Sequence, residues 1–496
     1  MSAIDFLKHV NAAVKSQMAS VIELPAFLET ADRLSLEELK TITRQALALL
    51  ELTYVHLPFK RAMHAVDPIQ RLKLLLYRLE NTPENQLPDE IEFHHEMTEI
   101  FTSLRDLHTN YLLPAPYNNK TAFLPFYIEE YFEEGKPKYI VSKVMEGFCH
   151  PTFKPGVEVR YWNGIPIARA IWLNGQRQAG GNQEARYARG LDSLTVRPMN
   201  RVLPPDEEWV CVEYRSPDGK DHEIKHKWLV FSPGSGRTAI NPNSITAEAT
   251  ALGLDIQTDA VQEAKKVLFA PGSIAAEKEV DRTGKKQAVA GDEIGTIMPG
   301  VFRARTINAG ELSFGYVRIF TFNVNNADQF VCEFIRLVGQ LPQNGLIIDV
   351  RGNGGGLIYA GEQLLQVITP HHIEPESFQF INTPLTYQLC QAHSPSQTLG
   401  GFDLTPWTRS TGMAVETGST YSQGYPVTDP NVCNAVGQKY YGPVVLITNA
   451  LCYSTTDIFA AGFQDLDIGK IIATSGNTGA GGANVWTSQL LQMLLN

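Results

Sequence analysis

The sequence predicts an α/β protein with three kinds of domain: N-terminal helices, a small β domain, and an α/β domain built on a largely parallel sheet. The first 86 residues follow the apolar period of helices, and residues 136–235 follow the alternation of strands. From Leu312 onward strands alternate with helices, which predicts right-handed βαβ units. We therefore expect boundaries at 1–86, 87–135, 136–235, 236–311 and 312–496, with 236–311 as a connecting region.

The composition excludes several classes of protein. A chain of 496 residues exceeds what one hydrophobic core supports, and 43% hydrophobic with 19% charged residues is typical of a globular protein. The net charge of -11, without a Lys/Arg-rich block, argues against a nucleic-acid partner. The start of the sequence does not resemble a secretory signal, and no long apolar run predicts a membrane helix, so a cytoplasmic location is the expectation.

Six cysteines are scattered along the chain without a Cys-x-x-Cys pair. This spacing argues against a zinc site and against a disulfide framework, and we expect reduced thiols.

The N-terminal helices carry a recognisable start signal. Ser35 and Glu38 have the spacing of a capping box before the apolar run of residues 35–52. Further on, "EMTEIFTSLRDLH" places its apolar residues on one helical face and leads to His108, where we expect the helix to end.

The predicted β domain contains Asn163-Gly164, a hairpin signal because both residues tolerate positive φ. Beyond it, "AEKEVDRTGKKQAVAGDEIG" predicts an exposed loop, since it is polar and contains glycine. The long stretch from His393 to Pro430 predicts an insertion, interpreted as a surface loop beside a cleft.

A glycine-rich loop, "DVRGNGGG", follows a buried strand at residues 349–356. Its glycines leave backbone N–H groups unshielded, so the loop can bind an anion. The loop lacks the P-loop lysine and the G-x-G-x-x-G spacing, and both absences argue against nucleotide binding. A tight connection between strand and helix is the simpler alternative.

Ser454 lies between an apolar strand and a predicted helix. With Asp457 it matches the capping-box pattern, which would account for the serine without any chemistry. A serine at the start of a helix, after a parallel strand, is also where an exposed nucleophile belongs. The sequence leaves both interpretations open.

His108, in "LRDLHTNY", is a candidate general base. A single histidine is more often an ordinary polar residue. At the predicted helix C-terminus, however, the helix dipole would favour the imidazolium that a base becomes when it accepts a hydroxyl proton.

Together these segments resemble the C-terminal-processing (tail-specific) peptidase family, which includes the tricorn core protease and the chlamydial protease-like activity factor. "GLIIDVRGNGGG" resembles the family's Asp-x-Arg-x-Asn-x-Gly-Gly loop, and "VVLITNALCYSTTDIFAAGFQD" resembles its nucleophile segment. "GVEVRYWNGIPI" resembles the hairpin of the inserted PDZ-like domain. The resemblance implies a ClpP/crotonase-like catalytic domain in residues 87–135 and 312–496, with the PDZ-like domain between them.

Two departures from the family matter. Members with a Ser/Lys dyad carry a lysine after the nucleophile helix, whereas this chain has "GNTGAGGANVW", so the resemblance implies the branch that uses histidine. There "RDLHTNY" matches the Asp-Gly-His-Thr-like motif, with Leu107 in place of glycine. That branch also orients its histidine with a distant glutamate, which we expect beyond residue 496; the catalytic domain is then incomplete at its C-terminus.

The resemblance implies a serine endopeptidase in which Ser454 is the nucleophile and His108 the base. It implies an oxyanion hole formed by the N–H groups of Gly355 and Thr455, with Gly354 and Gly356 in substrate binding. Polypeptides are the expected partners, no metal or organic cofactor is required, and self-association stays open.

Three alternatives remain at this stage. A catalytically inactive peptide-binding protein would use the same scaffold and capture extended chains by strand addition. An acyl-CoA enzyme of the related crotonase fold would use the glycine loop without a nucleophilic serine. Cys452 is a rival nucleophile within the same segment.

Overall fold

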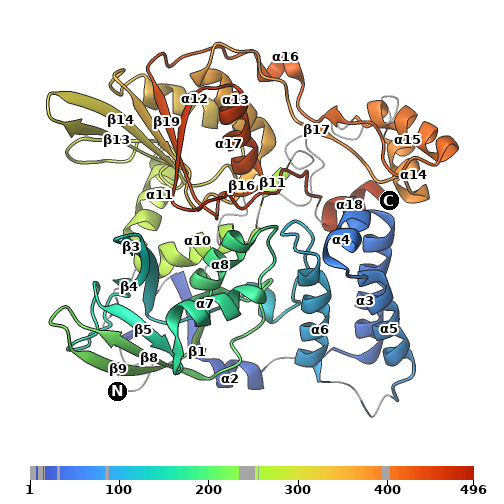
Figure 1. Cartoon of the computed structure of the whole chain (residues 1–496), viewed down its shortest axis with the longest axis horizontal. Helices are drawn as coiled ribbons and strands as arrows, with labels where there is room; N and C mark the ends of the chain where they lie inside the picture. Colours follow the sequence, from blue (N-terminus) through green and yellow to red (C-terminus); the bar gives the residue numbers. More distant parts are fainter. Residues whose placement is uncertain are drawn as a thin grey trace.

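The computed structural model describes residues 17–30, 34–83, 89–233, 252–254, 256–393, 403–486 and 488–495, with the short pieces 7–8, 10, 15 and 86. In Figure 1 the α/β sheet occupies the upper part of the molecule, the β domain lies below it, and the N-terminal helices stand to the right. Within the described residues, no helix combines the length and the apolarity that a bilayer crossing requires.

Helices dominate the N-terminal part of the chain: α2 (Leu24–Glu29), α3 (Leu36–Leu52), α4 (Leu57–His64), α5 (Pro68–Glu80) and α6 (Glu90–Ser103). The capping box at the start of α3 is confirmed, because the Glu38 N–H donates to Ser35 Oγ at 3.3 Å and the Ser35 N–H donates to Glu38 Oε2 at 2.7 Å. The prediction of helices alone is corrected by strand β1 (Met18–Glu23), which pairs with a strand of the β domain.

The β domain contains two sheets. One has the order β3-β4-β5-β8-β9, with β6 beside β5, and the other has the order β1-β10-β2-β7. The strands are β2 (Thr121–Phe123), β3 (Phe126–Glu133), β4 (Lys136–Val144), β5 (Glu158–Trp162), β6 (Ile165–Pro166), β7 (Val196–Pro198), β8 (Trp209–Arg215), β9 (Asp221–Lys227) and β10 (Leu229–Pro233). A short 3-10 helix, η2 (Tyr117–Asn119), precedes β2.

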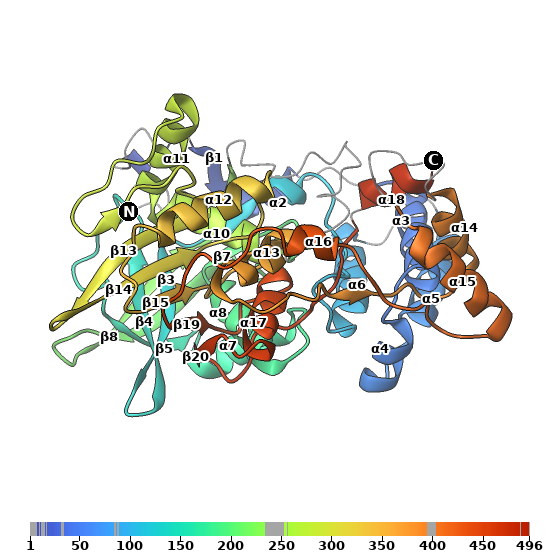
Figure 2. The same ribbon diagram turned by 90° about the horizontal axis from the view of Figure 1, so that it is seen from above.

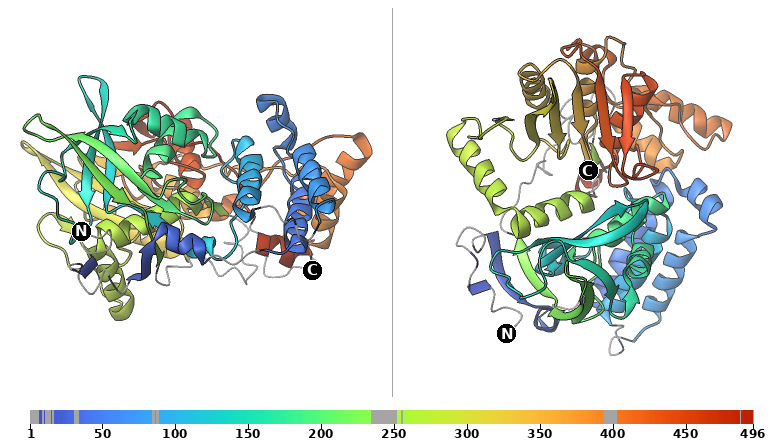
Figure 3. Two further views of the ribbon diagram at one scale, coloured as in Figure 1. Left: turned by 90° about the horizontal axis from the view of Figure 1, so that it is seen from below. Right: turned by 60° about the vertical axis from the view of Figure 1, so that its left-hand side comes forward.

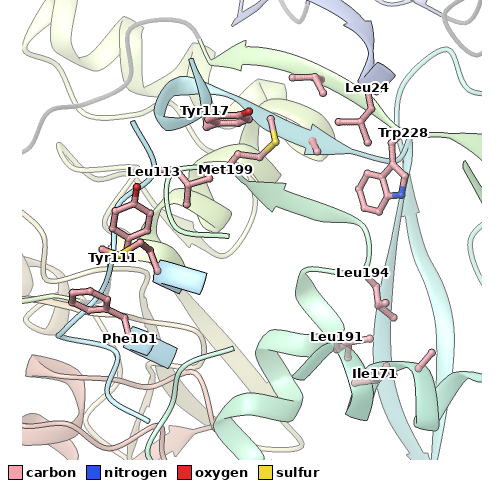
Figure 4. Close-up of a cluster of buried hydrophobic side chains, with 14 of the residues drawn as sticks. Leu24, Phe101, Tyr111, Leu113, Tyr117, Ile171, Leu191, Leu194, Met199 and Trp228 are labelled. Atoms are coloured by element: carbon pink, nitrogen blue, oxygen red, sulfur yellow. The ribbon is translucent and has the colours of Figure 1, made fainter. Parts of the chain in front are cut away.

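The predicted hairpin at Asn163-Gly164 is confirmed. Trp162 pairs with Ile165 across the turn, and the turn residues have φ values of 48° and 74°. Two helices, α7 (Ile167–Gln176) and α8 (Gln183–Asp192), cover the domain. Figure 4 shows part of the core between these elements, where Trp228 and Leu24 lie above Leu194.

The described part of the connecting region contains β11 (Leu252–Leu254), α10 (Ile256–Phe269) and α11 (Pro271–Thr283). The prediction of an exposed loop is therefore wrong for its first part, which is helical: Pro271 starts α11, and Gly284, with φ 63°, ends it. Figure 3 (right) shows these helices, in yellow-green, running between the α/β sheet and the β domain.

The α/β domain has a six-stranded sheet in the order β12-β13-β14-β15-β19-β20. Strands β14, β15, β19 and β20 are parallel, which confirms the predicted βαβ units. The strands are β12 (Glu293–Ile294), β13 (Phe302–Ala309), β14 (Leu312–Ile319), β15 (Leu346–Asp349), β19 (Val444–Thr448) and β20 (Gly469–Ala473). The helices are α12 (Ala327–Val338), α13 (Ile358–Ile368) and α17 (Thr455–Asp465).

Between α13 and β19 the chain makes an excursion of helices and short strands, so the predicted surface loop is corrected; residues 394–402 lie outside the described residues. The excursion comprises β17 (Ser377–Phe378), α14 (Pro384–Ala392), α15 (Thr405–Thr417), β18 (Tyr425–Pro426) and α16 (Pro430–Cys433). The last described element of the chain is the helix α18 (Ser488–Leu495).

The excursion reaches back to the N-terminal helices, as Figure 2 and Figure 3 (left) show. The Thr383 hydroxyl donates to the Leu52 carbonyl at 2.7 Å, and the Phe59 and Tyr421 rings stack at 5.6 Å. Glu362 of α13 anchors the beginning of the excursion, because its carboxylate accepts the Glu376 N–H at 2.9 Å. Burial raises the pKa of Glu362 to about 7.

Candidate active site

Ser454 occupies a strained turn between β19 and α17. Its backbone has φ 60° and ψ -121°, a conformation suited to glycine. Its side chain makes no capping hydrogen bond, so the capping-box interpretation is wrong. Asp457 instead accepts a hydrogen bond from the Thr478 hydroxyl. The serine is therefore held in its position by the backbone around it.

The hydroxyl of Ser454 is also enclosed. The residue is fully buried, and Oγ has no hydrogen-bond partner within the described part of the chain. The Ser454 N–H donates to the Ala480 carbonyl at 3.3 Å, and the Gly479 N–H donates to the Cys452 carbonyl at 2.7 Å. The segment after β20 thus covers the serine, and in this conformation the hydroxyl is closed to solvent.

The glycine loop begins at Asp349, which ends β15. Burial pushes the pKa of Asp349 upward, but hydrogen bonds from Arg351 and the charge of Arg318 outweigh burial and hold it below its ordinary value. The Arg318 Nη1–Asp349 Oδ1 distance is 2.5 Å. The carboxylate also accepts the Arg351 N–H at 3.1 Å, and so fixes the direction in which the loop leaves the strand.

Gly356 shows why the loop needs glycine. Its φ is 147°, and a Cβ there would lie 1.9 Å from the Phe322 carbonyl carbon. Gly356 forms a parallel β-bridge with Phe322. Gly356 belongs to the short strand β16 (Gly355–Leu357), which also pairs with β11 in an antiparallel arrangement. The strand edge of the glycine loop is therefore occupied by the connecting region.

Direct hydrogen bonds join the glycine loop to the Ser454 segment. The Gly352 N–H donates to Asn449 Oδ1 at 2.8 Å, and the Tyr453 N–H donates to the Asn353 carbonyl at 3.1 Å. The Thr455 hydroxyl donates to the Gly356 carbonyl at 2.9 Å. The structure thus brings together two of the segments that the sequence singled out.

Gly355, the predicted oxyanion donor, already has a partner in this structure. Its N–H donates to Asn353 Oδ1 at 3.0 Å. Gly354, predicted to bind substrate, is buried in the same loop.

His108 reaches the same site from the N-terminal side. Helix α6 ends at Ser103, so the prediction that His108 lies at a helix C-terminus is wrong, and the dipole argument does not apply because the effect fades within the last turn. The His108 ring packs against the Tyr453 ring with 4.8 Å between centroids. Leu107, fully buried, packs in the same cluster as Tyr453. The third segment therefore meets the residue that precedes Ser454.

Asp106 is a site residue that sequence reasoning missed. Its carboxylate accepts the His108 N–H at 2.9 Å and the Tyr54 hydroxyl at 2.7 Å, and it lies 3.2 Å from His56 Nδ1. Burial would raise the pKa of Asp106, but these hydrogen bonds and the charge of His108 hold it below its ordinary value. The only signal in the sequence was an acid two positions before the histidine.

Cys452 is fully buried in the core of the α/β domain. Its S–H donates to the Val350 carbonyl at 3.1 Å, and burial raises the pKa of the thiol to about 12. Because the thiolate is the nucleophilic form, this environment weighs against the rival nucleophile.

Ser454 lies between a parallel strand and a helix, a position in which α/β enzymes can present a nucleophile. Residues 313–492 match peptidase family S41, and residues 120–235 match the PDZ domain. One part of the chain is thus similar to the S41 peptidases, and another part is similar to PDZ domains. The predicted resemblance to the C-terminal-processing peptidases and the predicted fold class are confirmed.

The chain is also similar to individual proteins. The chloroplastic C-terminal processing peptidase of Tetradesmus obliquus is 28% identical over 37% of this chain; the match spans 41% of that protein. The crystal structure of mature CPAF has a TM-score of 0.56 at 15% identity, covering 88% of this chain and 83% of CPAF. Mature CPAF complexed with lactacystin has a TM-score of 0.54 at 15% identity, covering 88% of this chain and 84% of that one. These structures show that the fold is shared.

Proposed function

We propose that this protein is a serine endopeptidase that cleaves polypeptides through Ser454 and His108. The observation that carries the proposal is the strained turn at Ser454, bonded to the glycine loop on one side and packed through Tyr453 against His108 on the other. A non-glycine residue held in such a turn is typical of functional sites, where surrounding structure offsets the strain.

The reaction proceeds in two stages. His108 accepts the Ser454 hydroxyl proton as the oxygen attacks the scissile carbonyl carbon, and the imidazolium then gives that proton to the leaving amine. Water, deprotonated by the same histidine, attacks the acyl-serine ester; the imidazolium returns its proton to Ser454 as the carboxylic product leaves. Asp106 holds the histidine loop in place through the His108 N–H.

The oxyanion is held by the N–H groups of Gly355 and Thr455, each donor contributing about 3 kcal/mol to the transition state. Gly355 first has to exchange Asn353 Oδ1 for the oxyanion, because its N–H is bonded there in the closed arrangement. Gly354 and Gly356 provide the backbone against which an extended substrate lies. This last step requires β11 to leave the edge of β16.

A fluorophosphonate probe tests the proposal. The probe should label Ser454 of the unmodified chain covalently. It should not label the Ser454→Ala variant, and it should label the His108→Gln variant much more slowly. Casein hydrolysis should follow the same order. Cys452→Ser, a change in the same segment, is the matched control and should still be labelled. Undiminished labelling of Ser454→Ala would refute the nucleophile assignment.

A second candidate is a peptide-binding protein without catalysis. The complete burial of Ser454 and the occupied Gly355 N–H favour it. It predicts saturable binding of unfolded casein with no labelling by the probe, whereas the peptidase predicts labelling that increases when β11 is displaced, for example by Gly253→Pro.

The cellular location and assembly are also proposals. We propose a cytoplasmic location, supported by six free cysteines, three of them buried as thiols. Cell fractionation tests this point. Sedimentation would show whether the chain associates with itself.

A further inference from the structure

A cavity of about 350 Å³ lies between the end of α6 and the end of α7, and its lining includes no residue of the glycine loop or of the Ser454 segment. Both helices are labelled in Figure 1. The segment that follows β7 closes its remaining side, with Leu203 among the lining residues. The volume is at the lower end of the range for small-molecule pockets, so the ligand that fits is small.

Two guanidinium groups in the cavity wall, those of Arg105 and Arg197, make no direct ion pair with a carboxylate of the described residues, although Glu207 and Asp206 lie near enough to Arg197 to act on its charge. Arg105 Nη1 donates to the carbonyls of Gln176 and Gln178 at 3.2 and 3.3 Å. Arg197, only 5% exposed, donates through Nε to the Ser193 carbonyl at 3.2 Å and lies over the Trp228 ring. Among the described residues, neither arginine has a carboxylate within salt-bridge distance.

The other charges in the wall are already paired. Arg177 bonds to Asp206, and Glu99 lies 3.1 Å from Arg71. The cavity wall therefore carries three arginines against two carboxylates, in a chain whose net charge is -11. Burial of a cation without a partner is costly, so the wall favours an anion.

Two further observations point to a ligand. Thr98 Oγ1, in the same wall, is buried and has no hydrogen-bond partner within the described chain, so it is free to donate to an oxygen atom in the cavity. Burial also lowers the pKa of Arg105 and of Arg197, with the neighbouring Arg186 adding to the effect at Arg105. A bound anion would relieve both penalties.

We propose that this cavity binds a small organic or inorganic dianion, of the phosphate or dicarboxylate type. Arg105 and Arg197 bind its charged oxygens, and Thr98 donates a further hydrogen bond. Guanidinium groups suit this role because their planar sets of donors match the oxygens of carboxylate and phosphate groups.

The position of Arg105 links the cavity to the candidate active site. Arg105 has a φ of 51° and directly precedes Asp106, the residue that accepts the His108 N–H. A ligand that fixes Arg105 therefore also restrains the loop of His108. This consequence rests on the proposed peptidase function, whereas the binding site itself does not.

Calorimetric titration of the full chain with inorganic phosphate and, separately, with succinate tests the site. We expect saturable binding of at least one probe at one site per chain, and the probe that binds identifies the chemistry. Arg105→Gln should weaken binding at least about tenfold, since it removes a charge-assisted contact. Arg160→Gln, an exposed arginine of β5 paired with Glu158, is the matched control and should bind as the unmodified chain does.

Arg197→Gln would also remove the contact with the Trp228 ring and could disturb folding. A variant that keeps the charges of both Arg105 and Arg197 is therefore needed. Leu203→Trp fills the cavity and should abolish binding while the circular dichroism spectrum stays unchanged. Thr98→Val should weaken binding less than Arg105→Gln does. Absence of saturable binding for both probes, or binding that survives both Arg105→Gln and Leu203→Trp, would overturn the proposal.

Discussion

Replacing Ser454 by alanine should stabilise the protein, and replacing it by glycine should stabilise the protein further. The hydroxyl makes no capping bond and is buried without a partner, so Ser454→Ala loses no hydrogen bond and removes a buried polar group, which typically costs about 1–3 kcal/mol. Glycine also relieves the backbone strain of about 1–3 kcal/mol at φ 60°, against an entropy cost of about 0.5–1 kcal/mol. We expect Ser454→Gly to exceed Ser454→Ala in free energy of unfolding by about 1 kcal/mol.

Urea unfolding followed by tryptophan fluorescence measures the series, and Ser35 provides the matched control. Ser35 caps α3 through a hydrogen bond to the Glu38 N–H, so Ser35→Ala should lower the free energy of unfolding by about 1 kcal/mol. The two alanine variants should therefore differ in sign. If Ser454→Ala lost as much stability as Ser35→Ala, or if the glycine variant were less stable than the alanine variant, the reasoning from the strained turn would fail.

Three further changes test other parts of the structure. Because the pKa of Glu362 is raised from 4.5 to about 7, the unfolded chain loses this proton first and stability falls as pH rises through that interval. The change in free energy of unfolding caused by Glu362→Gln, measured with urea, should thus be more favourable at pH 8 than at pH 5 by about 2.5 kcal/mol. Equal changes at both pH values would contradict the raised pKa of Glu362. Asp106→Asn should cost about 2 kcal/mol at pH 7, where the carboxylate is charged, and should slow labelling of Ser454; if neither changed, Asp106 would not belong to the site. Cys452→Ser should leave peptidase turnover intact, and its loss in a folded variant would transfer the role of nucleophile to the thiol.

The sequence predicted those features that depend on local pattern. The alternation of strands and helices led to the parallel sheet, and the Asn163-Gly164 pair led to its hairpin, because both signals act over a few neighbouring residues. The role of Ser454 at the helix start was harder to predict. Its residue type matches a cap, and only the backbone angles show that the hydroxyl does not cap.

Features built from distant residues could not be predicted in this way. Asp106 acquires its importance from Tyr54 and His56, which lie in the short connection between α3 and α4. Arg105 and Arg197 are far apart in the sequence and meet at one cavity only through the packing of α6 against the β domain. No periodicity or spacing in the sequence predicts that two such distant residues line the same cavity.

The contact between Thr383 and Leu52 has a consequence for how the protein is made. These partners lie 331 residues apart, so at typical synthesis rates the N-terminal helices wait roughly a quarter of a minute to a minute for the excursion that covers them. Ser454 emerges from the ribosome later still. A nascent chain therefore contains its N-terminal helices and the segment similar to PDZ domains before the residues of the candidate active site are complete.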